Sequence, residues 1–493
     1  MTGINERGTL TGSFIVFLGL FIFFLMNGCA VNPVTGRSQL MLVSEDQEIA
    51  MGKQLYPNAL WGGEGGGGGY NDPALRAYLK NIVVDIQRIS HRPNLPVDFV
   101  VQNSSVPNAW AIPGHVAITR GLLAAIDNEA EFAFVMGHEM GHVSARHSAS
   151  QMSYAMLGRV LLGGTGLLLG SSGYSDAVLT AGTVGTSLVL LKFSRTDELD
   201  ADKLGVLYMS RLGYDPKNAL SAHRNLEKVS QQYAQSVGQE RSEQSFFNEL
   251  ISTHPRTDIR MDEVQNIINR TPRSVIKGDG TGRQRFRNMT ANLRRINNIY
   301  LNYYDKAARA FNKNNLREAS SLITQAISMD RTQPAFYVLN GFIALKKNNE
   351  KEAHRQFLQA LSLDGNYQPA LRGLGAVSYM DGNYNEGIHY LKRSLALFPE
   401  DAPSHYFLGM SYYRIRSYRS AIEPLKAFAE AQPKHPRVHG ILGQCYENIN
   451  DLQSAYNEYM LQVRIDANSD IGRTSASRAD AIKSSVRQNI DIN

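Results

Sequence analysis

The 493-residue sequence has little cysteine, little charge and no long basic run. Its 2 cysteines, Cys29 and Cys445, are too few for the disulfide framework that holds small secreted domains together. The net charge is +6, but no basic stretch alternates with aromatic residues, so nucleic acid is not an expected partner. Charged residues make up 19% and apolar residues 43% of the chain, which excludes a disordered protein and indicates a globular one of about two to four domains.

Long hydrophobic runs are also scarce. The apolar stretch from Phe14 to Met26 follows Arg7 and is shorter than the roughly 20 residues that a membrane-spanning helix needs. This length is typical of the core of a secretory signal, so residues 1–28 are predicted to be a signal peptide, with an uncleaved membrane anchor as the alternative. The stretch ends in Leu25–Cys29, which resembles a bacterial lipobox and predicts lipid attachment at Cys29.

The surroundings of the two cysteines add two expectations. Ala30 follows Cys29 at the position where lipoproteins retained in the inner membrane often carry aspartate, so the sequence favours the outer membrane. With Cys29 acylated, Cys445 has no partner for an intrachain disulfide. It lies in a predicted helix and is expected to be a small buried residue.

The glycine-rich segment 62–69 lacks the Lys-Ser/Thr pair of a P-loop, so it is predicted to be a flexible surface loop and not a phosphate site. It ends an N-terminal link, residues 29–70, whose helix is expected to start at Ser44 with Gln47 completing a capping box. Beyond it, the sequence predicts a helix over 72–89 with proline at its first position. Short strands are expected at 97–101, 110–112 and 115–119.

A helix is predicted from Asn128, a good N-cap, through the motif His-Glu-x-x-His. Glu131 stands three residues after Asn128, as in a capping box, and apolar residues follow at helical spacing. Histidines four residues apart share one face of a helix, so His138 and His142 can direct their imidazoles at one ion. Glu139 points elsewhere but can take a proton from water beside that ion. The motif therefore predicts a zinc hydrolase with one Zn²⁺ per chain.

The third ligand is expected in the acidic segment 194–202, which starts a second predicted helix. Glu198 and Asp202 are four residues apart and share a face, so one can bind zinc while the other holds a ligand histidine. His147 lies about 140° round the helix from His142 and is excluded as a co-ligand. Spacing alone leaves the choice open among Asp197, Glu198, Asp200 and Asp202.

Two segments between these motifs and the C-terminal region differ in composition. Residues 157–191 are apolar and glycine-rich, and glycine interrupts each run before it reaches spanning length. They are predicted to form a hairpin that covers the site or touches a membrane. Residues 270–296 are basic and polar and are expected to be a linker with a solvated face.

From Ala307 small residues recur every 34 positions, which is the period of tetratricopeptide repeats. In such repeats small side chains let paired helices approach closely. We expect about five repeats over 297–467, followed by a polar, loosely ordered tail at 468–493. The two series are Ala307, Gly341, Gly375, Gly409 and Gly443, and Ala319, Ala353, Gly387, Ala421 and Ala455.

Three motifs in order resemble the M48 family of zinc metallopeptidases: His138–His142, Glu198–Asp202, and Thr253–Pro255 with Arg260. The likeness covers about residues 32–265 plus the repeats, and it is strongest to periplasmic members that carry tetratricopeptide repeats. It implies a mainly α (α+β) protein. A zincin-like metallopeptidase domain with a small sheet over 71–269 would be followed by an α-solenoid.

The resemblance also implies roles for particular residues. Glu198 would be the third zinc ligand and Asp202 the acid that holds a ligand histidine. Asn108-Ala109 would begin an edge strand that binds substrate by β-augmentation. Arg260 would stabilise the developing oxyanion or order the site. His254 would close the open metal position in a self-inhibited resting state, or would be a structural histidine before a proline turn.

These observations predict an exported zinc-dependent endopeptidase, lipid-anchored and facing the periplasm, that cleaves proteins in envelope or outer-membrane quality control. Its repeats would dock substrates and envelope assembly proteins, and the lipid or the apolar hairpin would contact the membrane. The alternative is a chaperone or scaffold in outer-membrane assembly whose metal site is closed or inactive. Glu139 favours hydrolysis, because a structural zinc site has no need of a general base.

Overall fold

The computed structural model describes residues 29–62, 67–154, 193–237, 258–272 and 275–490. The predicted signal peptide, the apolar hairpin at 157–191 and His254 all lie outside these ranges. The chain divides into two compact units, Met1–Asn297 and Asn298–Asn493, and each is described by itself.

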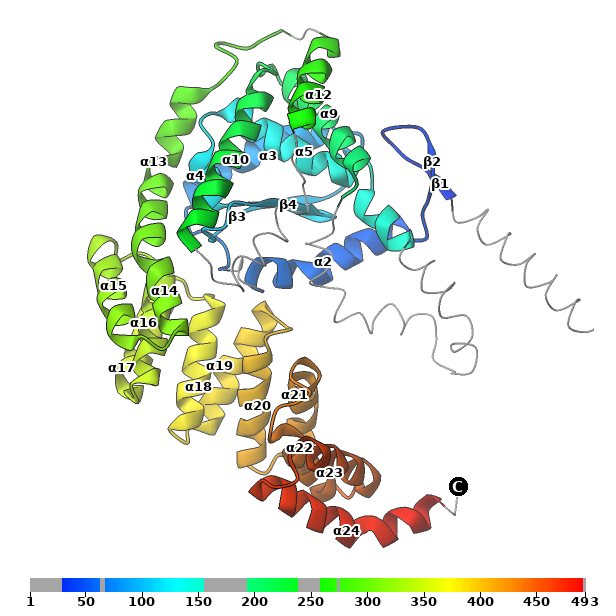
Figure 1. Ribbon diagram of the computed structural model, residues 1–493, viewed down its shortest axis with the longest axis vertical. Coiled ribbons are helices and arrows are strands. Elements are labelled where there is room, and N and C mark those ends of the chain that lie inside the picture. Colours follow the sequence, from blue (N-terminus) through cyan, green and yellow to red (C-terminus); the bar gives the residue numbers. More distant parts are fainter. Residues whose placement is uncertain (1–28, 63–66, 155–192, 238–257, 273–274, 491–493) are drawn as a thin grey trace, which may run out of the picture. The chain divides into compact units, whose positions relative to one another are not determined.

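A three-stranded sheet lies within the first unit (Figure 1). Strand β3 (Val97–Gln102) runs parallel to β5 (Gly114–Thr119), and β5 pairs antiparallel with β4 (Ala109–Ile112). The order β3-β5-β4 leaves β4 at an edge. The three strands expected from the sequence are thus confirmed. A separate two-stranded ribbon pairs β1 (Cys29–Val31) with β2 (Ser38–Leu40).

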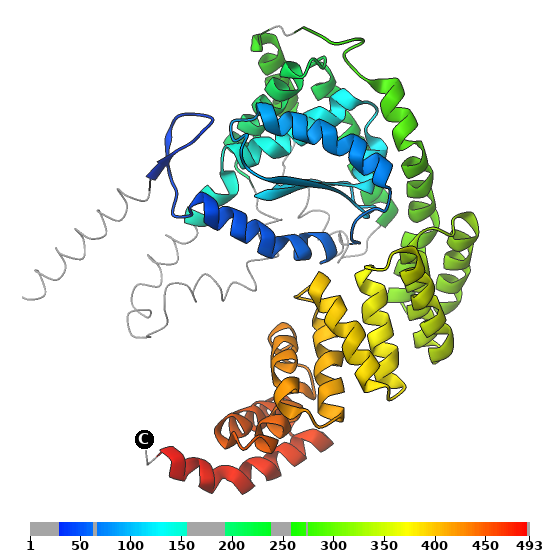
Figure 2. The same cartoon turned by 180° about the vertical axis from the view of Figure 1, so that it is seen from behind.

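Helices cover both faces of this sheet, α2 on one side and α3 and α5 on the other (Figures 1 and 2). Alternation along the strands explains this arrangement, because successive side chains point to opposite faces. Trp110 and Ala117 pack with Leu55 of α2, whereas Phe99 meets Phe132 of α5 with 6.0 Å between ring centroids. Within the described residues, the helices of this unit are α2 (Glu45–Trp61), α3 (Pro73–Ile89), α4 (Arg120–Ala125), α5 (Glu129–Ser144), α9 (Arg195–Arg211), α10 (Asn218–Val237), α12 (Asp258–Arg270) and α13 (Arg283–Ile299).

The predicted helix starts are confirmed by their caps. Ser44 caps α2, with Gln47 completing the capping box. The Asp72 side chain caps α3, which has proline at its first position. The side chain of Asn128 accepts a hydrogen bond from the amide of Glu131 and so caps α5, the helix that carries the His-Glu-x-x-His motif.

The second half of the predicted basic linker is a packed helix, so that prediction is wrong from residue 283 onward. Helix α13 buries Phe286, Leu293 and Ile296. Arg294 donates hydrogen bonds to the carbonyl oxygens of Ala124 and Ile126, at the end of α4. Apolar residues at helical spacing among the arginines give this helix a buried face. The composition of the segment is basic overall, so composition alone does not predict that face.

In the described part of the second unit, five helix pairs form the repeats, as the 34-residue period predicted. The small residues lie where the paired helices are closest: a Cβ built on Gly341 would come within 2.6 Å of the Phe357 ring, and one on Gly375 within 2.4 Å of Leu391. The pairs are α14 (Asp305–Asn312) with α15 (Leu316–Met329), α16 (Pro334–Lys346) with α17 (Glu350–Leu363), α18 (Gln368–Met380) with α19 (Tyr384–Leu397), α20 (Ala402–Arg414) with α21 (Tyr418–Ala431), and α22 (Val438–Asn448) with α23 (Leu452–Asp466).

The expected loose tail is instead a helix over most of its length, α24 (Asp470–Ile490). Its residues Ala479 and Ile482 are buried against Ala455 and Tyr459 of α23. The solenoid needs an element that covers its last apolar face, and two apolar residues at helical spacing in a polar segment are enough to supply it. Among the helices within the described residues, none is both long enough and apolar enough to span a bilayer.

Candidate metal centre

Helix α5 presents the two histidines of the motif side by side in the interior. His138 and His142 are both almost fully buried, and their Nε2 atoms lie 3.1 Å apart. Every residue of α5 from Ala130 to Ser144 is buried, so this helix runs through the core of the first unit. The imidazoles are therefore fixed by a rigid element and not by a surface loop.

Glu198 reaches the same point from α9. One of its carboxylate oxygens lies 3.4 Å from His142 Nε2 and the other 3.8 Å from His138 Nε2. A capping box at Ser194 and Asp197 starts α9 and sets its phase, so that the Glu198 and Asp202 side chains both face α5. Within the described part of the chain, the three side chains that could hold one ion are His138, His142 and Glu198.

Small residues allow α5 and α9 to come close enough for their donor side chains to meet. A Cβ on Gly205 of α9 would lie 3.0 Å from the carbonyl oxygen of Phe134, and one on Gly141 of α5 would lie 3.1 Å from the Cα of Ala201. The small positions alternate with the ligand positions along both helices. The same stripe therefore packs the helices and brings the three donor side chains together.

The donor set fits a divalent metal such as zinc. Two imidazole nitrogens and a carboxylate oxygen about 2.0–2.1 Å from a tetrahedral ion lie about 3.3 Å from one another, because the ligand spacing follows from the bond lengths. The two Nε2 atoms are 3.1 Å apart and Glu198 Oε1 is 3.4 Å from His142 Nε2, both close to that value. The 3.8 Å distance to His138 Nε2 is measured from the other carboxylate oxygen, Oε2. Three protein donors also leave the fourth position of a tetrahedron open, as in catalytic zinc sites.

Asp202 and Arg260 form a buried support behind two of the donors. His138 Nδ1 lies 2.8 Å from Asp202 Oδ1, and Arg260 pairs with Asp202 at 2.6 Å and with Glu198 at 2.6 Å. Burial by itself raises the pKa of Asp202, but Arg260, His223 and the hydrogen bonds it accepts outweigh burial and lower that pKa well below its usual value. Asp202 is therefore an ionised acceptor that orients the His138 ring.

His147 stands in the equivalent place behind His142. Their Nδ1 atoms lie 2.9 Å apart, and the His147 side chain is buried. On its other side, His147 Nε2 is 3.6 Å from a carboxylate oxygen of Asp197. Burial lowers the pKa of His147, although Asp197 and other nearby carboxylates oppose that shift. Phe193 stacks on the His142 ring with centroids 3.9 Å apart.

A buried ion cluster fixes the end of α5. Glu48 of α2 pairs with Arg92 and with Arg146, each at 2.8 Å. Arg92 also donates a hydrogen bond to the carbonyl oxygen of Val143, in the last turn of α5. Arg146 has φ +56, a left-handed conformation that is uncommon for residues other than glycine. The chain therefore leaves the helix at Arg146, and this turn places His147 behind His142.

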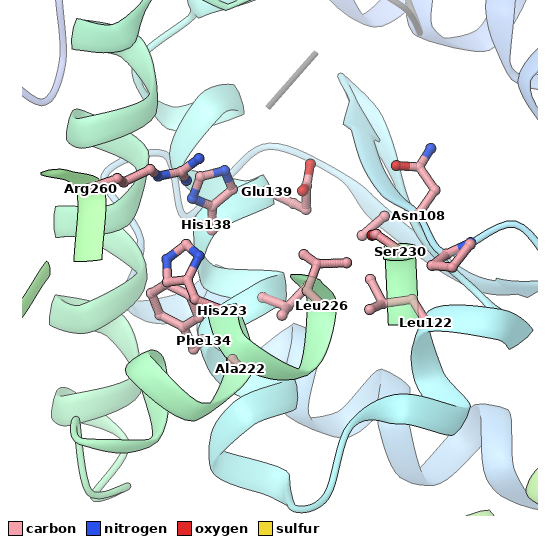
Figure 3. A pocket seen from close by; sticks show the side chains of 13 residues that line it. Asn108, Leu122, Phe134, His138, Glu139, Ala222, His223, Leu226, Ser230 and Arg260 are labelled. Atoms are coloured by element: carbon pink, nitrogen blue, oxygen red, sulfur yellow. The ribbon is translucent and has the colours of Figure 1, made fainter. Parts of the chain in front are cut away.

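A pocket of about 60 Å³ opens beside the donors (Figure 3). His138, Glu139 and Arg260 line one side of it, and Asn108 lies apart from them, just before edge strand β4 begins at Ala109. The rest of the lining is mostly apolar and comes from α4, α5, α10 and the segment before β4. It includes Leu122, Phe134, Val135, Ala222 and Leu226, together with His223, Ser230 and Pro107.

Most of the site residues expected from the sequence meet at this pocket or behind it. His138, His142, Glu198, Glu139, Asp202 and Arg260 lie together, and Asn108 and Ala109 face the same cavity. Arg260 bonds to the two carboxylates, which corresponds to the ordering role of the two roles expected for it. His254 lies outside the described residues, so its fourth-ligand role stays a prediction, as does lipidation of Cys29.

Two residues escaped the sequence analysis. His147 was considered only as a co-ligand on an unbroken helix, and the left-handed turn at Arg146 invalidates that geometry. His223 comes from α10, lines the pocket and lies 3.4 Å from Asp202. No motif marks His223, because its place depends on how α10 packs against α5. A signal for His147 was present, namely a third histidine within ten residues of the first.

Two regions of the chain match known protein families. Residues 73–268 match peptidase family M48, and residues 406–470 match the tetratricopeptide repeat. A crystal structure of MamA aligns with 32% of this chain and 94% of its own, with 19% identity and a TM-score of 0.30.

Curated relatives are also found. The beta-barrel assembly-enhancing protease of Escherichia coli (strain K12) is 29% identical over 251 residues, which are 50% of this chain and 48% of that protein. The mitochondrial metalloendopeptidase OMA1 of Arabidopsis thaliana is 33% identical over 141 residues, 28% of each chain. The OMA1 of Schizosaccharomyces pombe is 27% identical over 242 residues, 47% of this chain and 64% of that one. The chain spans about half the length of the first of these relatives.

Proposed function

This chain carries a peptidase family M48 domain followed by tetratricopeptide repeats, and from that premise we propose that it is a zinc-dependent endopeptidase that cleaves proteins in the cell envelope. The observation that carries the proposal is the buried cluster of His138, His142 and Glu198 beside Glu139, at a pocket that an edge strand borders. The name of the Escherichia coli relative, a beta-barrel assembly-enhancing protease, supports envelope quality control as the setting.

In the proposed mechanism His138, His142 and Glu198 would hold one Zn²⁺ per chain, which would supply Lewis-acid chemistry at the scissile carbonyl. Glu139 takes the proton from the attacking water and passes it to the leaving amine. Asp202 orients His138, and Arg260 holds the carboxylates of Asp202 and Glu198 in place. The burial of all these groups keeps bulk water away from the charges that develop.

An extended substrate would lie along β4, starting at Asn108-Ala109. Strand β4 is at the edge of the sheet and borders the pocket. Its outer side pairs with no strand among the described residues, and a peptide backbone can pair there by β-augmentation. The apolar lining from Leu122, Phe134 and Leu226 would take an apolar side chain of the substrate. Such a site recognises the peptide backbone and one side chain. It could therefore bind unfolded segments of many different proteins.

The location and partners extend the proposal beyond the described residues. A signal peptide at 1–28 would export the chain to the periplasm, and lipid on Cys29 would anchor it, with the outer membrane as the favoured site. The apolar segment 157–191 would be a second membrane contact or a cover. The repeats would dock protein substrates and envelope assembly proteins. His254 would be the autoinhibitory fourth ligand of the resting site.

The test compares cleavage of an unfolded β-barrel membrane protein by the wild type and by Glu139→Gln, each also in a His254→Ala background that removes the proposed self-inhibition. Loss of the general base should lower the cleavage rate by at least about 100-fold. Zinc content should stay at one per chain, because Glu139 is not a ligand. Glu198→Ala serves as the matched variant that should lose the zinc itself.

Two results of this comparison would contradict the proposal, the first for the peptidase activity and the second for the role of Glu139. If no variant cleaves and Glu139→Gln restores full function to cells that lack the protein, the chain is a chaperone or scaffold whose metal site is closed. If Glu139→Gln cleaves as fast as the wild type, the assignment of the base is wrong.

A further inference from the structure

Each of the two ligand imidazoles has one nitrogen that faces the other donors and one that faces away. On His138 the outer nitrogen, Nδ1, meets Asp202 Oδ1 at 2.8 Å. On His142 the outer nitrogen, also Nδ1, meets Nδ1 of His147 at 2.9 Å, with 72° between the two ring planes. One histidine is thus oriented by a carboxylate, and the other has a second histidine in the same position.

We propose that His147 is the positioning residue for the ligand His142, and this inference rests on the metal site of the proposed function. A separation of 2.9 Å between two ring nitrogens has room for one proton. His142 can offer a lone pair on Nε2 to a metal only if its proton is on Nδ1, so His142 is the donor and His147 Nδ1 the acceptor. The proton of His147 is then on Nε2, which faces Asp197 at 3.6 Å.

The surroundings leave the His142 ring little freedom. His147 fixes it through the outer nitrogen, and Phe193 stacks against its face with 24° between the ring planes. The acceptor itself is buried, so water does not compete for this hydrogen bond. The turn at Arg146, anchored by the pair with Glu48, holds the His147 backbone in place.

The two supports differ in charge. Asp202 is ionised and is paired with Arg260, so it adds negative charge behind His138. His147 orients His142 without adding a full negative charge. Removing an outer partner of a metal-binding histidine usually weakens metal binding by about 10–100-fold. Because removing His147 would cost orientation and no charge, we expect a loss of zinc affinity near the lower end of that range.

The test measures zinc affinity by competition with a chromogenic chelator, without substrate. His147→Leu should bind zinc about tenfold or more weakly than the wild type. His147→Asn, whose amide oxygen can occupy the position of Nδ1, should stay within about threefold. His115→Leu is the matched control and should bind as the wild type, because His115 stacks on Tyr56 of α2, on the face of the sheet away from α5. Urea unfolding of the metal-free variants shows whether each is folded.

The visible spectrum of the cobalt-loaded protein gives a second readout. A general packing defect would not be corrected by asparagine at position 147, whereas a lost hydrogen bond would be. His147→Asn should keep the wild-type cobalt spectrum and His147→Leu should change it. Wild-type affinity in His147→Leu, or equal losses in the Leu and Asn variants, overturns the inference and leaves the proposed peptidase intact. If His147→Leu does not fold, the affinity and spectrum of His147→Asn decide. A wild type that binds no zinc overturns both proposals.

Discussion

At the scale of single residues, the site depends on charges buried next to one another. Glu198 and Asp202 are almost completely removed from solvent, and Arg260, itself buried, pairs with both. Burial lowers the pKa of Arg260, but the two carboxylates raise it by more, so the guanidinium stays charged. Removing one member of such a cluster leaves a charge without compensation in the interior.

We therefore expect Arg260→Gln to lower the free energy of unfolding of the metal-free protein by about 3–5 kcal/mol. Added zinc should recover part of this loss, because the cation then compensates Glu198. Urea unfolding with and without zinc measures both effects. Arg195→Gln is the control: Arg195 is exposed and pairs at 3.2 Å with the partly buried Glu263, and loss of this pair should cost at most about 1 kcal/mol. Equal losses in the two variants would contradict the role of burial.

A second prediction concerns pH and the repeats. The hydrogen bond from His439 to Glu458, at 2.6 Å, raises the pKa of His439, although burial opposes it. A pKa raised by folding means that protonated His439 stabilises the folded state. This contribution is complete below about pH 6.5, the ordinary value, and is lost as pH rises through the folded-state pKa.

Unfolding of the wild type and His439→Gln, followed between pH 5.5 and 8.5, tests this. The wild type should be more stable than His439→Gln at the acidic end, and the difference in free energy of unfolding between the two should shrink toward the alkaline end. A difference that stays constant across this range would mean that the contact is not linked to protonation.

At the scale of elements, the approach of α5 to α9 builds the site. A Cβ on Gly205 or on Gly141 would lie 3.0 or 3.1 Å from the facing backbone, which is closer than ordinary van der Waals contact. We expect Gly205→Ala to lower the free energy of unfolding by about 1–3 kcal/mol and to weaken zinc binding, because the helices must separate. Gly365→Ala is the control, since its added methyl group would meet nothing closer than 4.0 Å. Unchanged zinc affinity in Gly205→Ala would show that α5 and α9 can accommodate the methyl group without moving the zinc ligands apart.

These elements also show what a sequence can and cannot reveal. The caps at Ser44, Asp72 and Asn128 and the 34-residue period are local or periodic signals, and the structure confirms what they predicted. The choice among four acids in 197–202 was open, because it depends on the face that α9 turns toward α5. His147 was misplaced by the assumption of an unbroken helix, since nothing local predicts the left-handed conformation of Arg146.

At the scale of the molecule, the chain contains one natural reporter for each compact unit. Its 2 tryptophans, Trp61 and Trp110, belong to the first unit, and Cys445 belongs to the second. The Cys445 side chain is fully buried within α22, and burial raises the pKa of its thiol to about 12, so it should not react with thiol reagents until the repeats unfold.

We predict that zinc shifts only the first reporter. At a free concentration one hundred times its dissociation constant, zinc should stabilise the first unit by about 2.7 kcal/mol and raise the urea midpoint of tryptophan fluorescence. The midpoint for Cys445 labelling, measured in a Cys29→Ser background, should not move. A parallel shift of both midpoints would mean that the two units unfold as one.

The Glu48 cluster bears on where an autonomous peptidase begins. Helix α2 precedes residue 73, the start of the family match, yet its glutamate neutralises two arginines beneath the last turn of α5. A fragment cut at residue 73 would keep both cations and discard their shared anion. Such a truncated protein would carry every metal donor and still lack the foundation under His142, so the functional module is longer at its N-terminal side than the family boundary indicates.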